Sequence, residues 1–234
     1  MKFNKAILAV ALSLVLLAVA APSHAIPMLR LTTDGGAPVT ITDQVVSVGG
    51  DLNPALGAVT FVGTVGVFDL NMTTGLTKPT LGSSASPSMS LTSSDSATSA
   101  AGSHTLVVEF SETGFGPVNS TFHLDITGVN SSGTILYEAF LGPANAFFST
   151  AIPLAAVGPS GPGISGSASS SQIVSPGPFS LTERVTISIT GPISITAPAS
   201  ASFNAALAVP EPGLLLLLGT GLLGVGLVGL RLNR

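Results

Sequence analysis

The stretch LVVEFS, residues 106–111, decides the predicted fold because its apolar and polar side chains alternate with a period of two. Leu106, Val108 and Phe110 fall on one face of an extended strand, and Glu109 falls on the other. This alternation is typical of a strand that packs one face against a core and leaves the other face in water. The stretch therefore predicts a half-buried β-sheet.

Other stretches alternate in the same way. Residues 121–127 and 185–190 do so, and the pattern continues at residues 193–195 after a Gly-Pro pair. Outside the two ends of the chain we find no series of apolar residues at helical spacing. Many short strands separated by turn residues predict an all-β fold, specifically an antiparallel β-sandwich.

Glycines and apolar runs refine this prediction. Residues 58–70 are apolar on both faces, which predicts a central strand, and Gly63 and Gly66 within it predict β-bulges. The Asp-Gly-Gly run at residues 34–36 and the Ser-Gly pair at residues 132–133 predict turns.

Two segments of low complexity leave an alternative open. Residues 82–103 are dominated by Ser, Ala and Thr, and residues 158–171 are rich in Gly, Pro and Ser. Such composition favours exposed, flexible loops. The alternative is that Ser-rich edge strands lie within them, since Met89 and Leu91 alternate with serines. We favour a single domain with two exposed segments.

The composition excludes several classes of protein. The chain has no Cys, which excludes a disulfide framework and a Cys-ligated metal site. Only seven Lys and Arg residues argue against nucleic-acid binding, which requires a basic surface. Three basic and ten acidic residues fall within residues 26–209, so this body is acidic.

Residues 1–25 are typical of a secretory signal peptide. Two lysines lie at the start, residues 6–21 are apolar or small, and Ser23 and Ala25 occupy the −3 and −1 positions of a cleavage site before Ile26. We therefore expect an N-terminal signal helix that is removed on export.

The other end of the chain contains a second membrane signal. Pro210-Glu211-Pro212 precedes an uncharged apolar run at residues 214–230, and Arg231 and Arg234 follow it. A helix of this length spans about 26 Å, just enough for a bilayer core. The arginines favour a cytoplasmic end, so both signals place residues 26–209 outside the membrane.

The Pro-Glu-Pro triplet, the apolar helix and the Arg-containing tail together resemble the PEP-CTERM sorting signal of exported proteins from Gram-negative bacteria that make extracellular polysaccharide. Residues 57–63, 75–79, 106–114 and 180–183 also resemble segments of secreted PEP-CTERM proteins with an all-β body. The resemblance implies recognition of Pro210, Glu211 and Pro212 by a membrane protease-transpeptidase of the exosortase type, with removal of the tail. It makes residues 210–234 a sorting signal that holds the chain in the inner membrane before processing.

The body itself contains no pattern that predicts an active site, a metal site or a cofactor. His104, His123 and Asp125 are the only residues that suggest a metal, and no third ligand is placed beside the last two. Glu109 or Glu112 would have to converge on them. No thiol nucleophile and no nucleophile-elbow motif is present. The residue pairs Asp51 and Asn53, and Asp69 and Asn71, lack the distal Glu of a calcium loop.

We therefore predict an exported, tail-sorted, non-enzymatic protein of the cell surface or the extracellular polysaccharide matrix. The first alternative is a carbohydrate-binding module. Such modules usually use exposed aromatic residues, and the chain has a single Tyr, Tyr137, and no Trp, so Phe115, Phe147 and Phe148 would have to serve as platforms. The second alternative is a secreted hydrolase that uses a pair of carboxylates about 5–9 Å apart.

Overall fold

The computed structural model describes residues 26–47, 49–97, 101–131, 133–161, 163–192 and 199–209. All regular secondary structure in these ranges is β-strand. The strands are β1 (Met28–Thr33), β2 (Val39–Thr42), β3 (Ala58–Val65), β4 (Phe68–Leu76), β5 (Ser88–Ala97), β6 (Ala101–Phe115), β7 (Val118–Ser120), β8 (His123–Asn130), β9 (Gly133–Gly142), β10 (Ile152–Ser160), β11 (Gly163–Ser169), β12 (Ile173–Ser175), β13 (Phe179–Pro192) and β14 (Ala199–Ala208).

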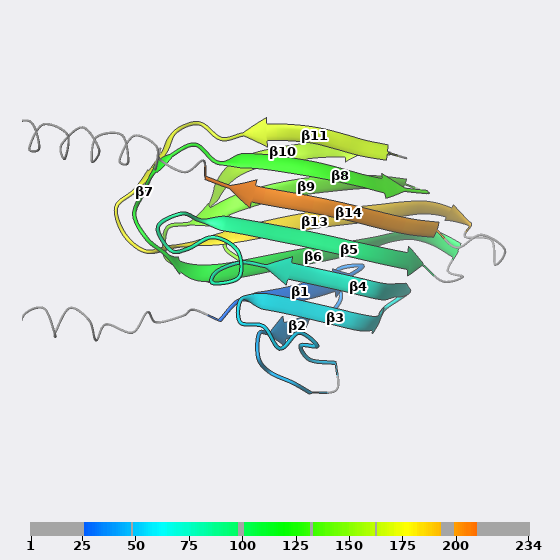
Figure 1. Cartoon of the computed structure of the whole chain (residues 1–234). Helices are drawn as coiled ribbons and strands as arrows, with labels where there is room; N and C mark the ends of the chain where they lie inside the picture. The colour runs from blue at the N-terminus through cyan, green and yellow to red at the C-terminus, as the bar shows by residue number, and fades with distance from the viewer. Residues whose placement is uncertain are drawn as a thin grey trace, which may run out of the picture.

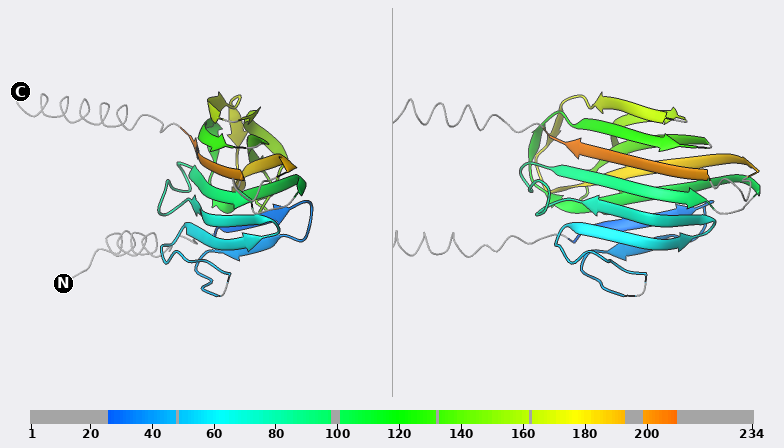
Figure 2. Two further views of the ribbon diagram at one scale, coloured as in Figure 1. Left: turned by 90° about the vertical axis from the view of Figure 1, so that its right-hand side faces the viewer. Right: turned by 45° about the vertical axis from the view of Figure 1, so that its right-hand side comes forward.

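The strands form two six-stranded antiparallel sheets that pack face to face (Figures 1 and 2). Sheet A has the order β10-β9-β13-β6-β1-β2, and sheet B has the order β11-β8-β14-β5-β4-β3. β7 and β12 pair separately as a short ribbon at one end. The predicted antiparallel β-sandwich is therefore confirmed.

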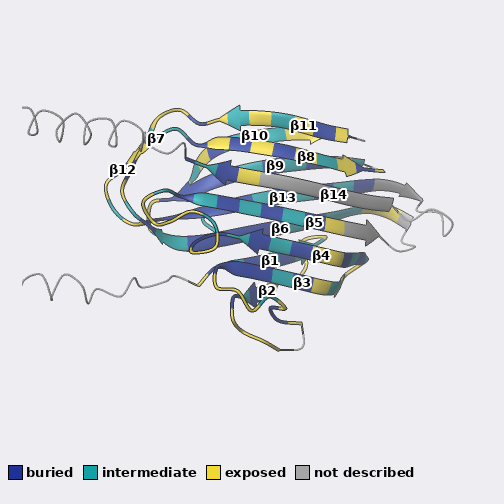
Figure 3. Ribbon diagram, viewed as in Figure 1, coloured by how far each residue is buried: buried dark blue, intermediate teal, exposed yellow. Residues whose placement is uncertain are grey.

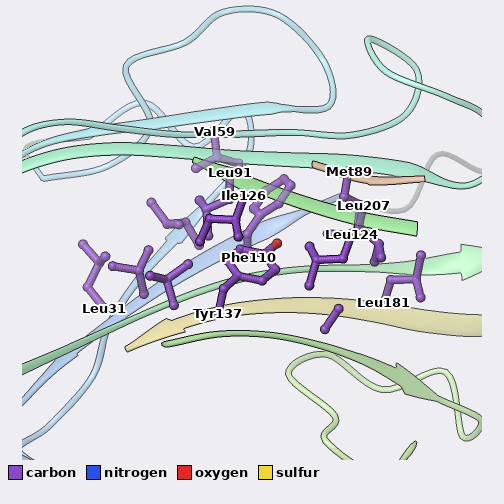
Figure 4. Close-up of a cluster of buried hydrophobic side chains, with 14 of the residues drawn as sticks. Leu31, Val59, Met89, Leu91, Phe110, Leu124, Ile126, Tyr137, Leu181 and Leu207 are labelled. Atoms are coloured by element: carbon purple, nitrogen blue, oxygen red, sulfur yellow. The ribbon is translucent and has the colours of Figure 1, made fainter. Parts of the chain in front are cut away.

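The core lies between the two sheets, where the predicted alternation places it. Leu106, Val108 and Phe110 of β6 are fully buried, and Val185 and Ile187 of β13 are buried beside them. Figure 4 shows part of the cluster, with side chains from both sheets meeting in one layer. Each large apolar side chain that is fully buried contributes roughly 1.5–3 kcal/mol, so this layer holds the sheets together.

The strand predicted at residues 121–127 is β8. Leu124 and Ile126 face the core, whereas His123 and Asp125 are exposed on the outer face of sheet B. Figure 3 shows this alternation of buried and exposed positions along the strand. His123 and Asp125 thus lie on the wet side of a half-buried strand, as the period of two requires.

The prediction of one central strand at residues 58–70 is wrong. The segment contains β3, the beginning of β4 and a turn between them, and β3 is the edge strand of sheet B. Gly63 marks a register shift, as predicted, but Gly66 lies in the turn with a φ of 59°. A Cβ at Gly66 would lie 2.5 Å from Thr33 Oγ1, so this turn requires glycine.

The preference for loops in the Ser-rich segments is also wrong. Strands lie within both segments, but only the second contains the edge strand that the alternative predicted. Residues 88–97 form β5, which lies in the middle of sheet B between β14 and β4. Met89 and Leu91 are completely buried, so these two apolar side chains pack the otherwise polar strand against the core. Residues 163–169 form β11, an edge strand.

The predicted signal peptide at residues 1–25, the sorting tail at residues 210–234 and the alternating residues 193–195 lie outside the described residues. Within the described ranges, no helix has the length and apolar character needed to cross a membrane. β1 begins and β14 ends at the same end of the sandwich, where residues 26 and 209 lie (Figure 1). The two predicted processing signals therefore adjoin the same end of the body.

Candidate functional site

The outer face of sheet A carries a row of alternating charges. Arg30 of β1 lies opposite Glu109 of β6, Glu109 lies opposite Arg184 of β13, and Arg184 lies opposite Glu138 of β9. Side chains directly opposite on neighbouring antiparallel strands lie close enough to interact. The register therefore places a positive, negative, positive and negative side chain side by side across four strands.

Two ion pairs form within this row. Arg30 Nε donates to Glu109 Oε2 at 2.6 Å, and Arg184 donates to Glu138 Oε2 from Nε at 3.0 Å and from Nη2 at 2.7 Å. The side chain of Glu109 is only 7% exposed, whereas the other three remain partly in contact with solvent. The row is thus a polar surface whose groups are held in position before any ligand arrives.

The β9–β10 loop, residues 143–151, lies against this outer face and is fixed by hydrogen bonds. The N–H of Phe148 donates to Ser111 Oγ at 3.0 Å, and Ser180 Oγ donates to the carbonyl of Ala146 at 2.6 Å. Asn145 Oδ1 accepts from the N–H of Gly114 at 2.7 Å. The loop is therefore attached to the sheet through both β6 and β13.

This loop also contains strained backbone. Asn145 has a φ of 55° and Phe148 a φ of 54°, and such values are unfavourable for a bulky residue like Phe. Strain of this kind persists only where surrounding contacts enforce it, and it is often found at functional sites. The hydrogen bond from Phe148 to Ser111 is one such contact.

Aromatic rings border the charged row. The Arg30 guanidinium lies 4.0 Å from the centre of the Phe148 ring, and the Arg184 guanidinium lies 4.7 Å from that of Phe140. The Phe147 ring lies 6.3 Å from Phe148, and both rings are half-buried. The surface therefore combines rigid aromatic area with fixed hydrogen-bonding groups, which suits a polar ligand that also has apolar faces.

The structure separates the aromatic residues that the sequence grouped together. Phe115 is completely buried and stacks on Phe179 with 5.9 Å between ring centres. Tyr137 is also fully buried. The suggestion that Phe115 could serve as a platform for sugars is therefore wrong, because its ring is used in the core, and Tyr137 is not available either. Phe147 and Phe148 remain on the surface.

An acidic residue lies at one end of the core with a full set of partners. Glu112 accepts a hydrogen bond from Lys78 Nζ at 2.6 Å and another from Thr77 Oγ1 at 2.7 Å. Lys78 Nζ also donates to the carbonyl of Thr113 and lies 4.4 Å from the centre of the Phe115 ring. Burial raises the pKa of Glu112, and the bonds from Lys78 and Thr77 oppose that rise.

A second acid is buried without such partners. Glu183 of β13 has no exposed surface, and its carboxylate makes no hydrogen bond of good geometry among the described residues. The Tyr137 hydroxyl and the backbone of Leu207 lie near it and weakly oppose the effect of burial on its pKa. The buried Tyr137 hydroxyl likewise makes no hydrogen bond of good geometry there, and Glu183 is the group that it faces. Burial raises the pKa of Glu183 from its ordinary value of 4.5 to about 8 and raises that of Tyr137 well above 10. Sequence reasoning missed this site, although an acid at a core-facing position was a visible signal.

The candidate metal ligands do not converge. His104 Nδ1 lies 2.8 Å from Asp34 Oδ2, while His123 Nδ1 lies 2.8 Å from Ser169 Oγ on the other sheet. The described residues contain no group of three His, Asp or Glu side chains that could hold a metal. Asp51 uses its carboxylate to accept three backbone N–H groups, from Gln44, Asn53 and Thr60, and so organises the β2–β3 loop.

The predicted sorting and cleavage residues lie outside the described residues, and the structure does not test them. The residues just before the sorting triplet are described. β14 pairs with β5 on one side and β8 on the other, so it lies inside sheet B. Val209 is buried, and its N–H donates to the carbonyl of Pro87 at 3.1 Å. The folded body therefore extends to the residue before Pro210.

Comparison with known proteins supports the interpretation of the tail. Residues 208–234 match the family of the PEP-CTERM protein-sorting motif. The chain thus carries a PEP-CTERM sorting motif at the residues where the sequence resemblance placed it, which confirms that prediction. No curated protein sequence matches the chain.

Several solved structures resemble the body weakly. The carbohydrate-binding module TmCBM61, in complex with β-1,4-galactotriose, has 6% identity and a TM-score of 0.33, with 78% of this chain and 88% of that chain covered. The N-terminal cellulose-binding domain of Cellulomonas fimi β-1,4-glucanase C has 13% identity and a TM-score of 0.29, with 66% and 89% covered. The enzymatically active domain of bacteriophage CBA120 tailspike protein 4 has 13% identity and a TM-score of 0.33, with 63% and 20% covered. At such TM-scores these likenesses carry no argument about function.

Proposed function

We propose that the chain is an exported, non-enzymatic protein of the cell surface or the extracellular matrix, and that a membrane protease of the exosortase type removes its tail. The PEP-CTERM motif at residues 208–234 carries this proposal. Glu211, held between two prolines that restrict the backbone to extended conformations, is the charge that we expect the protease to recognise.

The position of β14 supports a specific form of the product. β14 contributes the buried Leu207 to the core, and Val209 is hydrogen-bonded to Pro87. Loss of these residues would remove an interior strand of sheet B or part of it. The protease should therefore cut on the C-terminal side of Val209, so that the complete body is released.

The test is the intact mass of the protein recovered from cells that contain the protease. The wild-type product should end at or after Val209 and lack residues 214–234, whereas E211A and a chain without residues 214–234 should not undergo tail-dependent processing. D125A is the matched control, because Asp125 is an exposed acid far from the tail, and it should be processed normally. A wild-type product that still ends at Arg234 would refute the proposal.

The charged residues of the body support a non-enzymatic role. Glu109 and Glu138, the two acids in the outer row of sheet A, are each ion-paired with an arginine, and Arg184 lies between them in the register. Two strand steps separate their backbones by about 10 Å, beyond the spacing of carboxylate pairs in retaining glycosidases and near the upper limit for inverting ones.

A second candidate function is carbohydrate binding at the outer face of sheet A. The observation that favours it is the fixed β9–β10 loop, which places Phe147 and Phe148 beside the charged row. All three basic residues of the body are already paired with acids, so the surface suits a neutral sugar better than an anionic one.

A glycan array tests this second function. We expect binding of neutral polysaccharides by the wild-type protein and a loss of about five- to thirtyfold in F148A, since loss of an aromatic contact to a bound ring costs about 1–2 kcal/mol. M72A is the control, because Met72 is exposed on the other sheet. Equal binding by F148A and M72A, or no binding by the wild type, would exclude this site.

A further inference from the structure

The sandwich has four edge strands, and three of them are protected against pairing with another chain. The edges are β2 and β10 in sheet A and β3 and β11 in sheet B. An exposed edge presents unpaired N–H and C=O groups that can bind a further strand, and natural proteins normally block such edges. The way in which each edge is blocked shows which one is left open.

The edge strands β2 and β3, which come from the N-terminal half of the chain, are protected in different ways. β2 is too short to offer many backbone groups, and β3 is covered by a loop. β2 has only four residues. The edge of β3 is covered by the β2–β3 loop, where the N–H of Leu52 donates to the carbonyl of Thr60 and the N–H of Thr60 donates to Asp51 Oδ1, both at 2.9 Å. β3 also has a register shift after Phe61, which bends the strand.

β10 is blocked by proline and by irregular geometry. It contains Pro153 and Pro159, and proline cannot donate a backbone hydrogen bond to a neighbouring strand. Its pairing with β9 is interrupted by two register shifts, one after Pro153 and one after Val157. A second chain therefore finds no regular series of donors and acceptors along this edge.

β11 has none of these protections. Its seven residues, GISGSAS, contain no proline and no charge, and they pair with β8 in an unbroken register from Gly163 to Ser169. Among the described residues, no strand pairs with the opposite side of β11. Its core side is closed, since Ile164 is buried and Gly166 lies against Val157 of β10. What remains open is the regular backbone edge alone.

We propose that the β11 edge is a strand-addition surface and that its partner is β11 of a second copy of this chain. The two strands pair antiparallel about a two-fold axis, so that sheet B continues into sheet B of the partner. Such a contact is isologous, which means that the same surface serves both copies and the assembly closes as a dimer.

The absence of charge on β11 favours this edge for self-association. The body carries ten acidic and three basic residues, so two copies repel each other over most of their surface. β11 contributes no charge to the contact, and its outer face carries only Ser165, Ser167 and Ser169. The nearest acid is Asp125 on β8, opposite Ser167. Across the paired edges the two copies of Asp125 lie three strand steps apart, about 14 Å, which exceeds the Debye length in physiological salt.

The first test is the oligomeric state of the full chain in detergent micelles, measured by sedimentation at increasing protein concentration. The wild type should dimerise, and S167K should be at least tenfold weaker, because it places a charge from each copy at the contact. S90K is the matched control, since Ser90 lies on the same outer face but on the interior strand β5. Any association through the tail is common to all three proteins, so the test does not depend on how the tail is processed.

A second measurement locates the contact. The chain has no cysteine, so a spin label attached to S167C or to S90C is the only one in each molecule. Pulsed electron paramagnetic resonance should give a distance between copies below about 20 Å for S167C and near 34 Å for S90C, which is seven strand steps from its partner. A wild type that stays monomeric at 100 μM, equal effects of S167K and S90K, or a shorter distance for S90C than for S167C would each overturn the proposal.

Discussion

Glu112 and Glu183 are two buried acids on neighbouring strands of one sheet, and they differ in their hydrogen-bond and ion-pair partners. Glu112 lies opposite Leu181, and Glu183 lies opposite Phe110, so both point to the core from adjacent positions in the register. Lys78 and Thr77 bind both oxygens of Glu112, whereas, among the described residues, Glu183 has no charged partner and only weak contacts with the Tyr137 hydroxyl and the backbone of Leu207.

The difference between these acids shows that position decides whether a buried charge can be compensated. Glu112 lies at the end of the sandwich, where the segment after β4 brings Thr77 and Lys78 to it. Glu183 lies further inside, where no cation of the described residues reaches it and only the Tyr137 hydroxyl and the backbone of the buried Leu207 come near its carboxyl. A buried carboxyl without a charged partner remains protonated, because ionisation in an apolar environment is costly. The two acids therefore predict different responses to pH and to substitution.

The largest effect should come from the ionisation of Glu183. Its pKa is about 8 in the folded protein and near 4.5 in the unfolded chain, so the unfolded state releases this proton first as the pH rises. The free energy of unfolding should fall between these two values by about 1.4 kcal/mol per pH unit, of the order of 5 kcal/mol in total. Urea unfolding from pH 4.5 to pH 9 measures it.

E183Q is the variant that isolates this effect. Its side chain cannot ionise, so its unfolding free energy should not show the fall between pH 4.5 and pH 8, and it should exceed that of the wild type above pH 8. E138Q, which alters an acid on the outer face, should retain the wild-type profile in this range. Parallel pH profiles for E183Q and the wild type would show that Glu183 is not the responsible group.

The second largest effect should follow loss of the partner of Glu112. K78M leaves the carboxyl buried without its cation, with only the hydrogen bond from Thr77, and removal of one partner of a buried ion pair typically costs about 3–5 kcal/mol. The double variant K78M/E112L should recover most of this loss, since an apolar pair of similar volume avoids the desolvation cost. Denaturant unfolding at pH 7 compares the three proteins. A cost below 1 kcal/mol for K78M would mean that this pair behaves like a surface pair.

A smaller effect is expected in the outer row of sheet A. Arg184 and Glu138 form an ion pair that is only partly buried, with side-chain exposures of 28% and 23%. R184A should lower the unfolding free energy by about 1 kcal/mol, with part of the loss coming from contact with Phe140. Thermal unfolding at low and high salt checks this, since the electrostatic part should shrink in 1 M salt. A loss that is unchanged by salt would assign the whole effect to packing.

The smallest effect should occur at the most exposed pair. Asp34 is bound by His104 and by the N–H of Thr105, and these bonds lower its pKa. The stabilisation is present above the ordinary pKa of 3.8 and is lost as the pH falls through the lower folded value. D34N should cost only a few tenths of a kcal/mol at pH 5, since solvent screens the pair. Asn also tolerates the φ of 50° at this turn, so a loss above 1 kcal/mol would contradict this assignment.

Local periodicity accounts for the parts of the fold that could be predicted. The alternation in β6, β8 and β13 identified which side chains are buried, because strand geometry alone assigns residues to faces. Serine content misled the prediction at β5, since composition does not show that a strand lies between two neighbours. The same applies to Phe115, which was predicted as a surface residue and is buried.

What the sequence alone determined about this protein is the all-β class, the buried faces of its main strands and the sorting motif at residues 208–234. What only the tertiary structure decided is which charges meet. Arg30 and Glu109 are separated by 79 residues, and Lys78 and Glu112 by 34, yet each pair is in contact. The physical reason is that the face of a side chain depends on its own strand, whereas its partner depends on the order and register of all the strands.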